Sequence, residues 1–307
     1  MEPITPFELK QVNAWMLLGE NNPDGTNYFS PNSQYQRMIT KEVYKSVDFL
    51  FICFVTSKPT DSKSVPTGDG GSYTLSLLPN PDWVKPTMQD AMDDIIVKAR
   101  AMNQGIKIMA TFTYGTRDNE GFQLENIFQA NYTDQQNASN FADNVVAYLR
   151  HYNLDGFDFD WEWPLSDETS VEHFTIIVKA LSDRFKQELT NTGRKFYLTI
   201  SPAINSDTIK FLPADLINNY VDFVNLQLYY STTLIEGCDP GKLCYGAKFE
   251  PNRSVESPDA PGVQSAEEAY NDNKENFQFS TMTVWRVNSQ NFEYEQDQLI
   301  ALYNMKA

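Results

Sequence analysis

Four acidic residues stand within one eleven-residue stretch, LDGFDFDWEWP, which runs from Leu154 to Pro164. Side chains of a β-strand alternate between its two faces, so Asp158, Asp160 and Glu162 share one face of the predicted strand. Phe and Trp side chains occupy the opposite face. Same-face neighbours lie roughly 7 Å apart along a strand. The three carboxyl groups therefore form a row that runs toward the C-terminal end of the strand.

This row of carboxyl groups predicts acid–base chemistry. Carboxylates that are crowded into a partly dry interior repel one another and lose solvation, and both effects raise the pKa. At least one of the three is therefore expected to hold a proton near neutral pH. A protonated carboxyl group that points into a cleft is what general-acid catalysis on a glycosidic oxygen requires.

The elements that must position these groups are predicted from runs of apolar, β-branched and aromatic residues. Eight such runs alternate with helical patterns: 11–18, 47–55, 106–114, 154–163, 195–203, 221–230, 243–250 and 279–287. Several are almost continuously apolar, as is typical of parallel strands that are covered on both faces. Eight strands that alternate with helices predict a (β/α)8 TIM barrel with residues 1–307 as a single catalytic domain. Active sites of this fold lie at the C-terminal ends of the strands.

Helices are predicted from apolar stripes and cap signals. A capping box that starts at Thr169 precedes an apolar stripe that runs to Leu189. The helical pattern that starts at Met88 is expected to end at Gly105. Further helices are expected over 134–153, 265–276 and 293–306, and the stretches 57–72 and 251–263 are interpreted as long loops.

The composition narrows the class of ligand. The formal net charge of −17 repels a phosphate backbone and argues against nucleic acid as a partner. Aromatic residues make up 13% of the chain, which suits stacking on sugar rings as well as filling a core. Two histidines and three cysteines offer little for a metal site, so neither a metal nor another cofactor is expected. No apolar run of about 18 residues occurs, so no membrane span is expected.

The acidic strand also resembles a known family. Residues 155–162, DGFDFDWE, match the D-G-x-D-x-D-x-E signature of glycoside hydrolase family 18, the chitinases and endo-β-N-acetylglucosaminidases. The signature falls on the fourth predicted strand, as it does in that family. VNLQLYYS resembles the family's sixth strand and gives Gln227 and Tyr229, and STMTVWRV resembles the eighth strand and gives Trp285. The resemblance covers nearly the whole chain and implies the barrel fold.

The sequence departs from the family pattern on two strands. The third strand reads MATFTYGT where many members carry S-x-G-G, and Ser231 stands where the sixth-strand form M-x-Y-D has its aspartate. These departures leave the branch of the family, and therefore the substrate, open. About fifteen residues separate 243–250 from the helix that starts near Ser265. The extra domain that some chitinases insert there is therefore expected to be absent, which favours a shallow cleft and endo-cleavage.

The resemblance implies retaining hydrolysis in which the substrate assists. Glu162 would protonate the leaving glycosidic oxygen and then act as the base for the incoming water. The substrate's own 2-acetamido carbonyl would be the nucleophile and would form an oxazolinium ion. Asp160 would orient the acetamido N–H, and Asp158 would share a proton with Asp160, as close carboxyl pairs do.

Three further residues would complete the site by the same resemblance, and each has a structural alternative. Tyr229 would donate its hydroxyl to the acetamido oxygen, although strand alternation turns only one of Tyr229 and Tyr230 inward. Gln227 would lie beside it, but a buried glutamine also needs a structural hydrogen bond. Trp285 would form an apolar floor under the sugar, or would simply fill the core.

Three functions are compatible with these observations. The first is an endo-acting retaining hydrolase of β-1,4-linked N-acetylglucosamine, either in chitin and chitooligosaccharides or in the core of N-linked glycans. The second is a non-catalytic lectin or inhibitor on the same fold; such relatives typically lack the terminal Glu of the signature, and Glu162 is present. The third is a calcium-binding structural protein, although a calcium loop requires a turn-rich segment.

The expected partner is thus an oligo- or polysaccharide that contains N-acetylglucosamine, bound by a monomer. Chitin and glycans are mostly extracellular, which predicts an extracellular location. The N-terminus, MEPITPFELKQ, shows neither the basic nor the apolar region of a secretory signal.

Overall fold

The computed structural model of the chain describes residues 7–18, 30–59, 73–77, 87–113, 127–128, 132–161, 168–203, 212–229, 234–250 and 263–307. The chain divides into two compact units. Unit 1 comprises Met1–Ile52, Asn80–Ile106 and Leu243–Ala307, and unit 2 comprises Cys53–Pro79 and Lys107–Lys242. Three residues that the sequence singles out, Glu162, Tyr230 and Ser231, lie outside the described residues.

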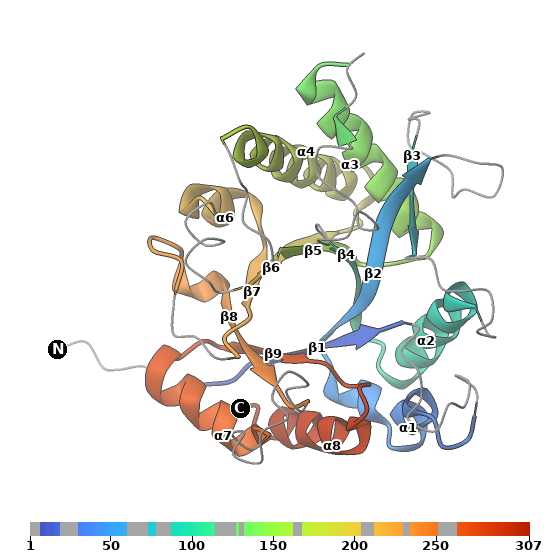
Figure 1. The fold of residues 1–307 in the computed structure, drawn as a ribbon, viewed down its shortest axis with the longest axis vertical. Coiled ribbons are helices and arrows are strands. Elements are labelled where there is room, and N and C mark those ends of the chain that lie inside the picture. The colour runs from blue at the N-terminus through green and yellow to red at the C-terminus, as the bar shows by residue number, and fades with distance from the viewer. Residues whose placement is uncertain are drawn as a thin grey trace. The chain divides into compact units, whose positions relative to one another are not determined.

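Unit 1 contains parallel strands and the helices that follow them. Its strands are β1 (Gln11–Leu17), β8 (Leu243–Lys248), β9 (Thr281–Trp285) and the first residues of β2 (Phe49–Pro59). Its helical elements are α1 (Gln34–Thr40), η1 (Val43–Ser46), α2 (Met88–Met102), α7 (Ala266–Asp272), η4 (Asn273–Phe277) and α8 (Phe292–Tyr303). β9 pairs in parallel with β1 and with β8, and β1 also pairs with β2. Helices α7 and α8 lie side by side (Figure 1).

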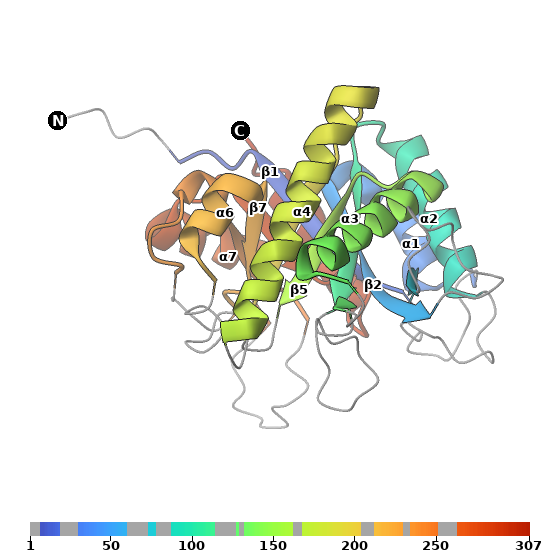
Figure 2. The ribbon, with the colours of Figure 1, turned by 90° about the horizontal axis from the view of Figure 1, so that it is seen from above.

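Unit 2 carries the acidic strand in the middle of a parallel sheet. Its strands are the part of β2 from Cys53 onward, β3 (Tyr73–Leu77), β4 (Lys107–Thr113), β5 (Gly156–Trp161), β6 (Tyr197–Pro202) and β7 (Phe223–Leu226). Its helical elements are α3 (Asp134–His151), α4 (Glu168–Thr192), α6 (Ala214–Tyr220) and η3 (Pro240–Lys242). The parallel strands follow the order β4-β5-β6-β7. Helices α3 and α4 pack against each other along this sheet (Figures 1 and 2).

All eight predicted strands are present, with ends that differ from the prediction by a few residues. The sequence pattern does not predict strand β3, because the strand is short and follows directly after the stretch 57–72, whose composition indicates a loop. It pairs antiparallel with the end of β2, which continues to Pro59. The first three residues of the predicted loop are therefore strand.

Three helix predictions are wrong in detail. Thr169 is already part of helix α4, which is described from Glu168 onward, so it is not an N-cap residue. Leu189, the last residue of the predicted apolar stripe, is 47% exposed. The 25 residues of α4 span roughly 37 Å, which exceeds the roughly 20 Å of the six-residue strand β5 that the helix covers, so its end extends past the core.

Helix α2 ends before the predicted glycine cap. Its last residue is Met102, and Asn103 has the extended backbone angles φ −137° and ψ 98°. The Asn103 side chain donates hydrogen bonds to the carbonyl oxygens of Tyr44 and Val47 at 3.2 and 2.9 Å. These bonds end the helix at Asn103, so Gly105 is not its left-handed C′ residue.

An aspartate precedes three of the strands and holds the start of a neighbouring strand. The three aspartates are Asp48, Asp155 and Asp222. Each accepts a hydrogen bond from a backbone N–H of the neighbouring strand; the donors are Val12, Ile108 and Leu198, at 2.7, 2.8 and 2.9 Å. In each pair the aspartate's own N–H donates back to the carbonyl of the same residue. These carboxylates therefore extend the sheet's hydrogen bonding at the N-terminal ends of the strands.

Two further observations bear on the predictions. Within the described ranges, no helix combines the length and the apolar character that a membrane-spanning segment needs.

The sequence leaves open whether Cys238 and Cys244 form a disulfide. Both are thiols, as is Cys53.

Candidate active site

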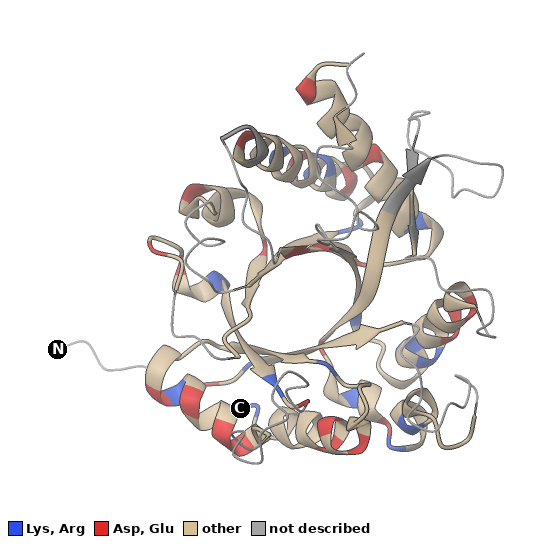
Figure 3. Cartoon of the chain, in the orientation of Figure 1, with Lys and Arg blue, Asp and Glu red and all other residues tan. Residues whose placement is uncertain are grey.

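Strand β5 separates its aromatic face from its acidic face, as the alternation of its residues predicts. Phe157, Phe159 and Trp161 are fully buried. The rings of Phe159 and Trp161 pack on Phe174 of α4, with centroid distances of 5.4 and 3.9 Å. Because this face is committed to the helices, the aspartates of β5 must project from the opposite face. Figure 3 colours acidic positions red, and red positions are visible on this strand of unit 2.

The glycine of the signature allows the strands around β5 to approach closely. A Cβ atom at Gly156 would lie 2.3 Å from the carbonyl oxygen of Tyr197 and 2.5 Å from Cε of Met109. Any other residue would push β5 away from its neighbours β4 and β6. The glycine thus fixes the spacing that brings β6 side chains into reach of the β5 carboxylates.

Asp158 is completely buried and accepts hydrogen bonds from two hydroxyl groups of β6. Thr199, which lies opposite Asp158 in the strand register, places its Oγ1 2.6 Å from Asp158 Oδ1. Ser201 places its Oγ 2.9 and 3.0 Å from the two carboxylate oxygens. Asn225 of β7 in turn donates to Ser201 Oγ at 3.0 Å. A buried carboxyl group thus receives the donors that its burial requires.

Asp160 is only half-buried and lies beside Gln227, one of the predicted binding residues. Gln227 Nε2 donates to Asp160 Oδ1 at 3.2 Å and to the backbone oxygen of Ser201 at 3.0 Å. Its two bonds show that Gln227 has a structural role and also touches an aspartate of the signature. The structure therefore brings Asp158, Asp160 and Gln227 together at the C-terminal part of β5.

The remaining predicted residues occupy different places. Tyr229 lies half-buried in a turn after β7, two residues beyond Gln227. Trp285 is the last residue of β9 in unit 1; its ring meets that of Trp15 edge-on, with centroids 5.9 Å apart. Glu162, the predicted proton donor, follows β5 directly but lies outside the described residues. Its role stays a prediction.

Glu250 is a residue of unit 1 that sequence reasoning missed. Its Oε1 accepts a hydrogen bond from the Trp285 indole N–H at 3.2 Å and lies 3.0 Å from Lys248 Nζ. Its Oε2 accepts from Arg286 Nε at 2.9 Å. Burial by itself raises the pKa of Glu250, but the hydrogen bonds and charges of Arg286 and Lys248 outweigh burial and lower it.

The residues around Asp158 that were missed share a sequence signal that could have revealed them. Polar residues alternate with apolar ones inside strands that are otherwise buried, in T-I-S of β6 and N-L-Q of β7. Thr199, Ser201 and Asn225 occupy such positions and are at most 1% exposed. A polar side chain at a buried strand position requires a polar partner. Thr199 and Ser201 find it in Asp158 of β5, and Asn225 finds it in Ser201.

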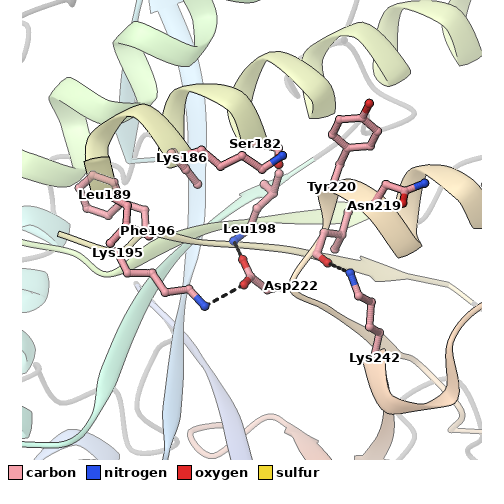
Figure 4. Close-up of a pocket in the computed structure, with 12 residues that line it drawn as sticks. Ser182, Lys186, Leu189, Lys195, Phe196, Leu198, Asn219, Tyr220, Asp222 and Lys242 are labelled. Carbon is pink, nitrogen blue, oxygen red and sulfur yellow. Dashed lines mark hydrogen bonds and ion pairs between the residues drawn. The ribbon is translucent and has the colours of Figure 1, made fainter. Parts of the chain in front are cut away.

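Unit 2 also has a cavity of about 320 Å³ between α4, α6 and the start of β6 (Figure 4). Its lysines already have partners. Lys195 pairs with Asp222 at 3.0 Å, and Lys242 donates to three backbone carbonyls at the end of α6, those of Ile217, Asn218 and Val221. Burial lowers the pKa of Lys242. The cavity lies at the N-terminal end of β6, whereas active sites of parallel α/β barrels lie at the C-terminal ends.

Comparison with known proteins identifies the family. The model of glycosyl hydrolases family 18 matches residues 26–290, and the chain belongs to this family. The endochitinase of Brugia malayi is 29% identical over 130 residues, which are 42% of this chain and 23% of that protein. The aligned regions thus span less than a quarter of that relative's length. The family predicted from the acidic signature is confirmed.

Solved structures of similar shape establish the fold. The chitinase-like agglutinin RobpsCRA from Robinia pseudoacacia has a TM-score of 0.64 and 13% identity, covering 95% of this chain and 99% of that one. A family 18 chitinase from Cycas revoluta, solved in complex with (GlcNAc)4, has a TM-score of 0.60 and 14% identity over 96% of this chain and 99% of that one. The predicted (β/α)8 barrel is confirmed.

Proposed function

We propose that this chain is an endo-acting retaining glycoside hydrolase that cleaves β-1,4-linked N-acetylglucosamine in chitin or chitooligosaccharides. The observation that carries the proposal is the grouping of Asp158, Asp160 and Gln227 at the C-terminal part of β5. A buried aspartate, a half-buried aspartate and a polar side chain meet at the end of the barrel where this fold carries its active sites. That the Cycas revoluta relative was solved with (GlcNAc)4 supports the class of ligand.

In the proposed mechanism, Glu162 protonates the glycosidic oxygen while the substrate's acetamido oxygen attacks the anomeric carbon. Asp160 accepts the acetamido N–H and offsets the positive charge of the oxazolinium ion. Tyr229 donates its hydroxyl to the acetamido oxygen, and Glu162 then removes a proton from the attacking water. An internal nucleophile held in an attack geometry contributes roughly 7–11 kcal/mol through proximity. General-acid catalysis adds a further factor of about 10²–10⁴.

Trp285 is proposed as the apolar floor under the sugar at the cleavage point. Its indole N–H is taken by Glu250, and its edge meets Trp15. A ring whose polar edge is already satisfied offers an apolar face for stacking against a sugar. We also propose that the chain acts outside the cell, where chitin occurs.

Two alternatives remain for the same site. The first is an endo-β-N-acetylglucosaminidase that acts on N-glycan cores, since the sixth strand carries Gln227 and Tyr229 in place of M-x-Y-D. The second is a non-catalytic lectin, which the structural likeness to the agglutinin RobpsCRA favours. The presence of Glu162 favours an enzyme over the lectin.

The test is hydrolysis of chitotetraose and of a high-mannose glycoprotein by the wild-type chain and by Glu162→Gln. We expect the wild type to release chitobiose and the Gln variant to be slower by a factor of about 10²–10⁴. Glu172→Gln, at an exposed position of α4, is the matched control and should keep full activity.

Each other outcome selects a different function. Cleavage of the glycoprotein without cleavage of chitotetraose identifies the N-glycan alternative. Binding of chitotetraose without any turnover by the wild-type chain identifies the lectin. Equal rates for the wild type and Glu162→Gln exclude Glu162 as the proton donor.

A further inference from the structure

Three polar residues of β6 and β7 form a hydrogen-bond network around Asp158. The hydroxyl groups of Thr199 and Ser201 lie 2.6 and 2.9 Å from its carboxylate, and Asn225 Nδ2 lies 3.0 Å from Ser201 Oγ. All three side chains are at most 1% exposed. None of them belongs to the signature D-G-x-D-x-D-x-E.

The direction of these hydrogen bonds follows from the chemistry of the donors. An amide nitrogen only donates, so Asn225 donates a hydrogen bond to Ser201 Oγ. The hydroxyl group of Ser201 in turn donates its hydrogen bond to Asp158. The carboxylate thus accepts from Ser201 and from Thr199. Hydrogen bonds donated to a carboxylate stabilise its ionised form.

The two aspartates of β5 receive different hydrogen-bond donors. Ser201 lies opposite Asp160 in the strand register, yet its hydroxyl reaches Asp158. Gln227 Nε2 donates to Asp160 at the longer distance of 3.2 Å. Both hydroxyl donors of β6 therefore donate to Asp158, the more deeply buried of the two carboxylates.

The residues opposite Asp158 on the neighbouring strands are uncharged. Thr111 lies opposite it on β4 and Thr199 on β6, while Asp160 is the titratable neighbour on its own strand. Glu162, the next acidic residue in the sequence, lies outside the described residues. Because the hydroxyl donors of β6 carry no charge of their own, they stabilise the anion without neutralising it.

We propose that Thr199, Ser201 and Asn225 are positioning residues of the hydrolysis, which hold Asp158 in its ionised form. Asp158 then stands as a negative charge beside Asp160, the residue that orients the acetamido group. Thr199 acts on Asp158 directly, and Asn225 acts through Ser201. The inference rests on the proposed function, because it assigns a role within the same site.

The test is the pH profile of kcat/KM on chitotetraose, which reports the titration of the free enzyme. Removal of a hydroxyl donor makes protonation of Asp158 easier, so the acidic limb of the profile moves to higher pH. We expect Thr199→Val and Ser201→Ala each to move this limb upward by about one pH unit. Their rates should approach the wild-type rate again near neutral pH. The hydroxyl-bearing variants Thr199→Ser and Ser201→Thr should restore the limb.

A double-mutant cycle tests the path through Ser201. Asn225→Leu should move the acidic limb upward in the wild-type background and leave it unmoved in the Ser201→Ala background. Ser182→Ala removes a buried hydroxyl on α4 of the same unit and serves as the matched control. Its profile should match that of the wild type. Thermal unfolding of every variant checks that the fold is kept.

Several results would overturn the inference. An unmoved acidic limb in Thr199→Val and Ser201→Ala, or a uniform loss of rate at every pH, reduces the network to a structural role. An Asn225→Leu shift that persists in the Ser201→Ala background removes the path through Ser201. Absence of turnover by the wild-type chain overturns the proposed function and this inference together. Turnover with an unmoved limb overturns the inference alone.

Discussion

The two ends of strand β5 use the same residue type for different purposes. At the N-terminal end, Asp155 accepts a hydrogen bond from the backbone N–H of Ile108 and donates its own N–H back. At the C-terminal end, Asp158 and Asp160 accept from hydroxyl and amide side chains. A carboxylate that completes the backbone pairing stabilises the sheet. A carboxylate that is held by neighbouring side chains can be tuned for a reaction.

Glu250 of unit 1 extends this comparison to a third kind of environment. Its partners include the cations of Lys248 and Arg286, which lower its pKa and fix its charge. The hydroxyl donors of Asp158, in contrast, are uncharged. The partners of a carboxylate thus decide whether it supports the fold, orients a neighbour or takes part in proton transfer.

Asp160→Asn should give the largest effect of any substitution at the two ends of β5. The amide keeps the size of the side chain but removes the charge that offsets the oxazolinium ion. We expect kcat on chitotetraose to fall by a factor of about 10²–10³, with little change in the melting temperature. An unchanged kcat would show that the C-terminal end of β5 is as structural as its start.

Glu250→Ala should give the largest loss of stability. It removes the acceptor of the Trp285 indole and the carboxylate that pairs with Arg286, which is 6% exposed. Loss of one partner of a buried ion pair costs about 3 kcal/mol in the free energy of unfolding. Because the pKa of Glu250 is lowered in the fold, its contribution is present above the ordinary Glu range. It is lost as the pH falls through the folded pKa.

Chemical denaturation at about pH 7 and about pH 3 measures this dependence, since the two values lie on either side of the ordinary Glu range. The difference in the free energy of unfolding between the wild type and Glu250→Ala should be smaller at the lower pH. Glu250→Gln is the control, because its amide oxygen still accepts the indole N–H. If Glu250 orients Trp285, this variant should keep the KM for chitotetraose better than the Ala variant does. Equal KM values in the two variants would contradict that role.

Glu295→Gln should change the stability less than Glu250→Ala does, and the stability contribution of Glu295 should depend on pH in the opposite direction. Burial raises its pKa to about 7, although Ser289 donates hydrogen bonds to it through N–H and Oγ. A raised folded pKa means that stability is fully present below the unfolded pKa and is lost as the pH rises through about 7. The free energy of unfolding of Glu295→Gln, relative to that of the wild type, should rise by about 2 kcal/mol between about pH 5 and about pH 8. A constant difference in unfolding free energy would contradict the assignment.

Asp155→Asn should give the smallest effect and is the matched control for Asp160→Asn. Asparagine still accepts the Ile108 N–H, so only the added strength of a charged acceptor is lost, about 1 kcal/mol of stability. We expect a small fall in melting temperature and an unchanged kcat. A loss of kcat comparable with that of Asp160→Asn would erase the distinction between the two ends of the strand.

Much of the fold was predictable because its signals are local. Parallel strands that are buried on both faces appear as apolar runs, and all eight predicted runs contain strands. The hairpin strand β3 was not predicted, because a strand of five residues shows little periodicity in its sequence. The end of α2 was not predictable because it depends on distant contacts, the bonds of Asn103 to the carbonyls of Tyr44 and Val47.

The candidate site was predictable to the extent that its chemistry lies in one contiguous motif. The row of Asp158 and Asp160 follows from strand alternation alone. The donors that determine the state of Asp158 come from two other strands, and no local pattern links Ser201 or Asn225 to Asp158. Glu250 was missed for the same reason, since its pairing with Trp285 depends on the register of β8 and β9.

The central claim is that the acetamido group of the substrate is the nucleophile, with the β5 carboxylates holding the proton and the charge. Proton NMR of the first sugar released from chitotetraose tests it most directly. The account predicts that the β-anomer is formed first and that the corresponding glucosamine oligomer, which lacks acetyl groups, is not cleaved. Initial release of the α-anomer, or cleavage of the deacetylated oligomer at a similar rate, would contradict it.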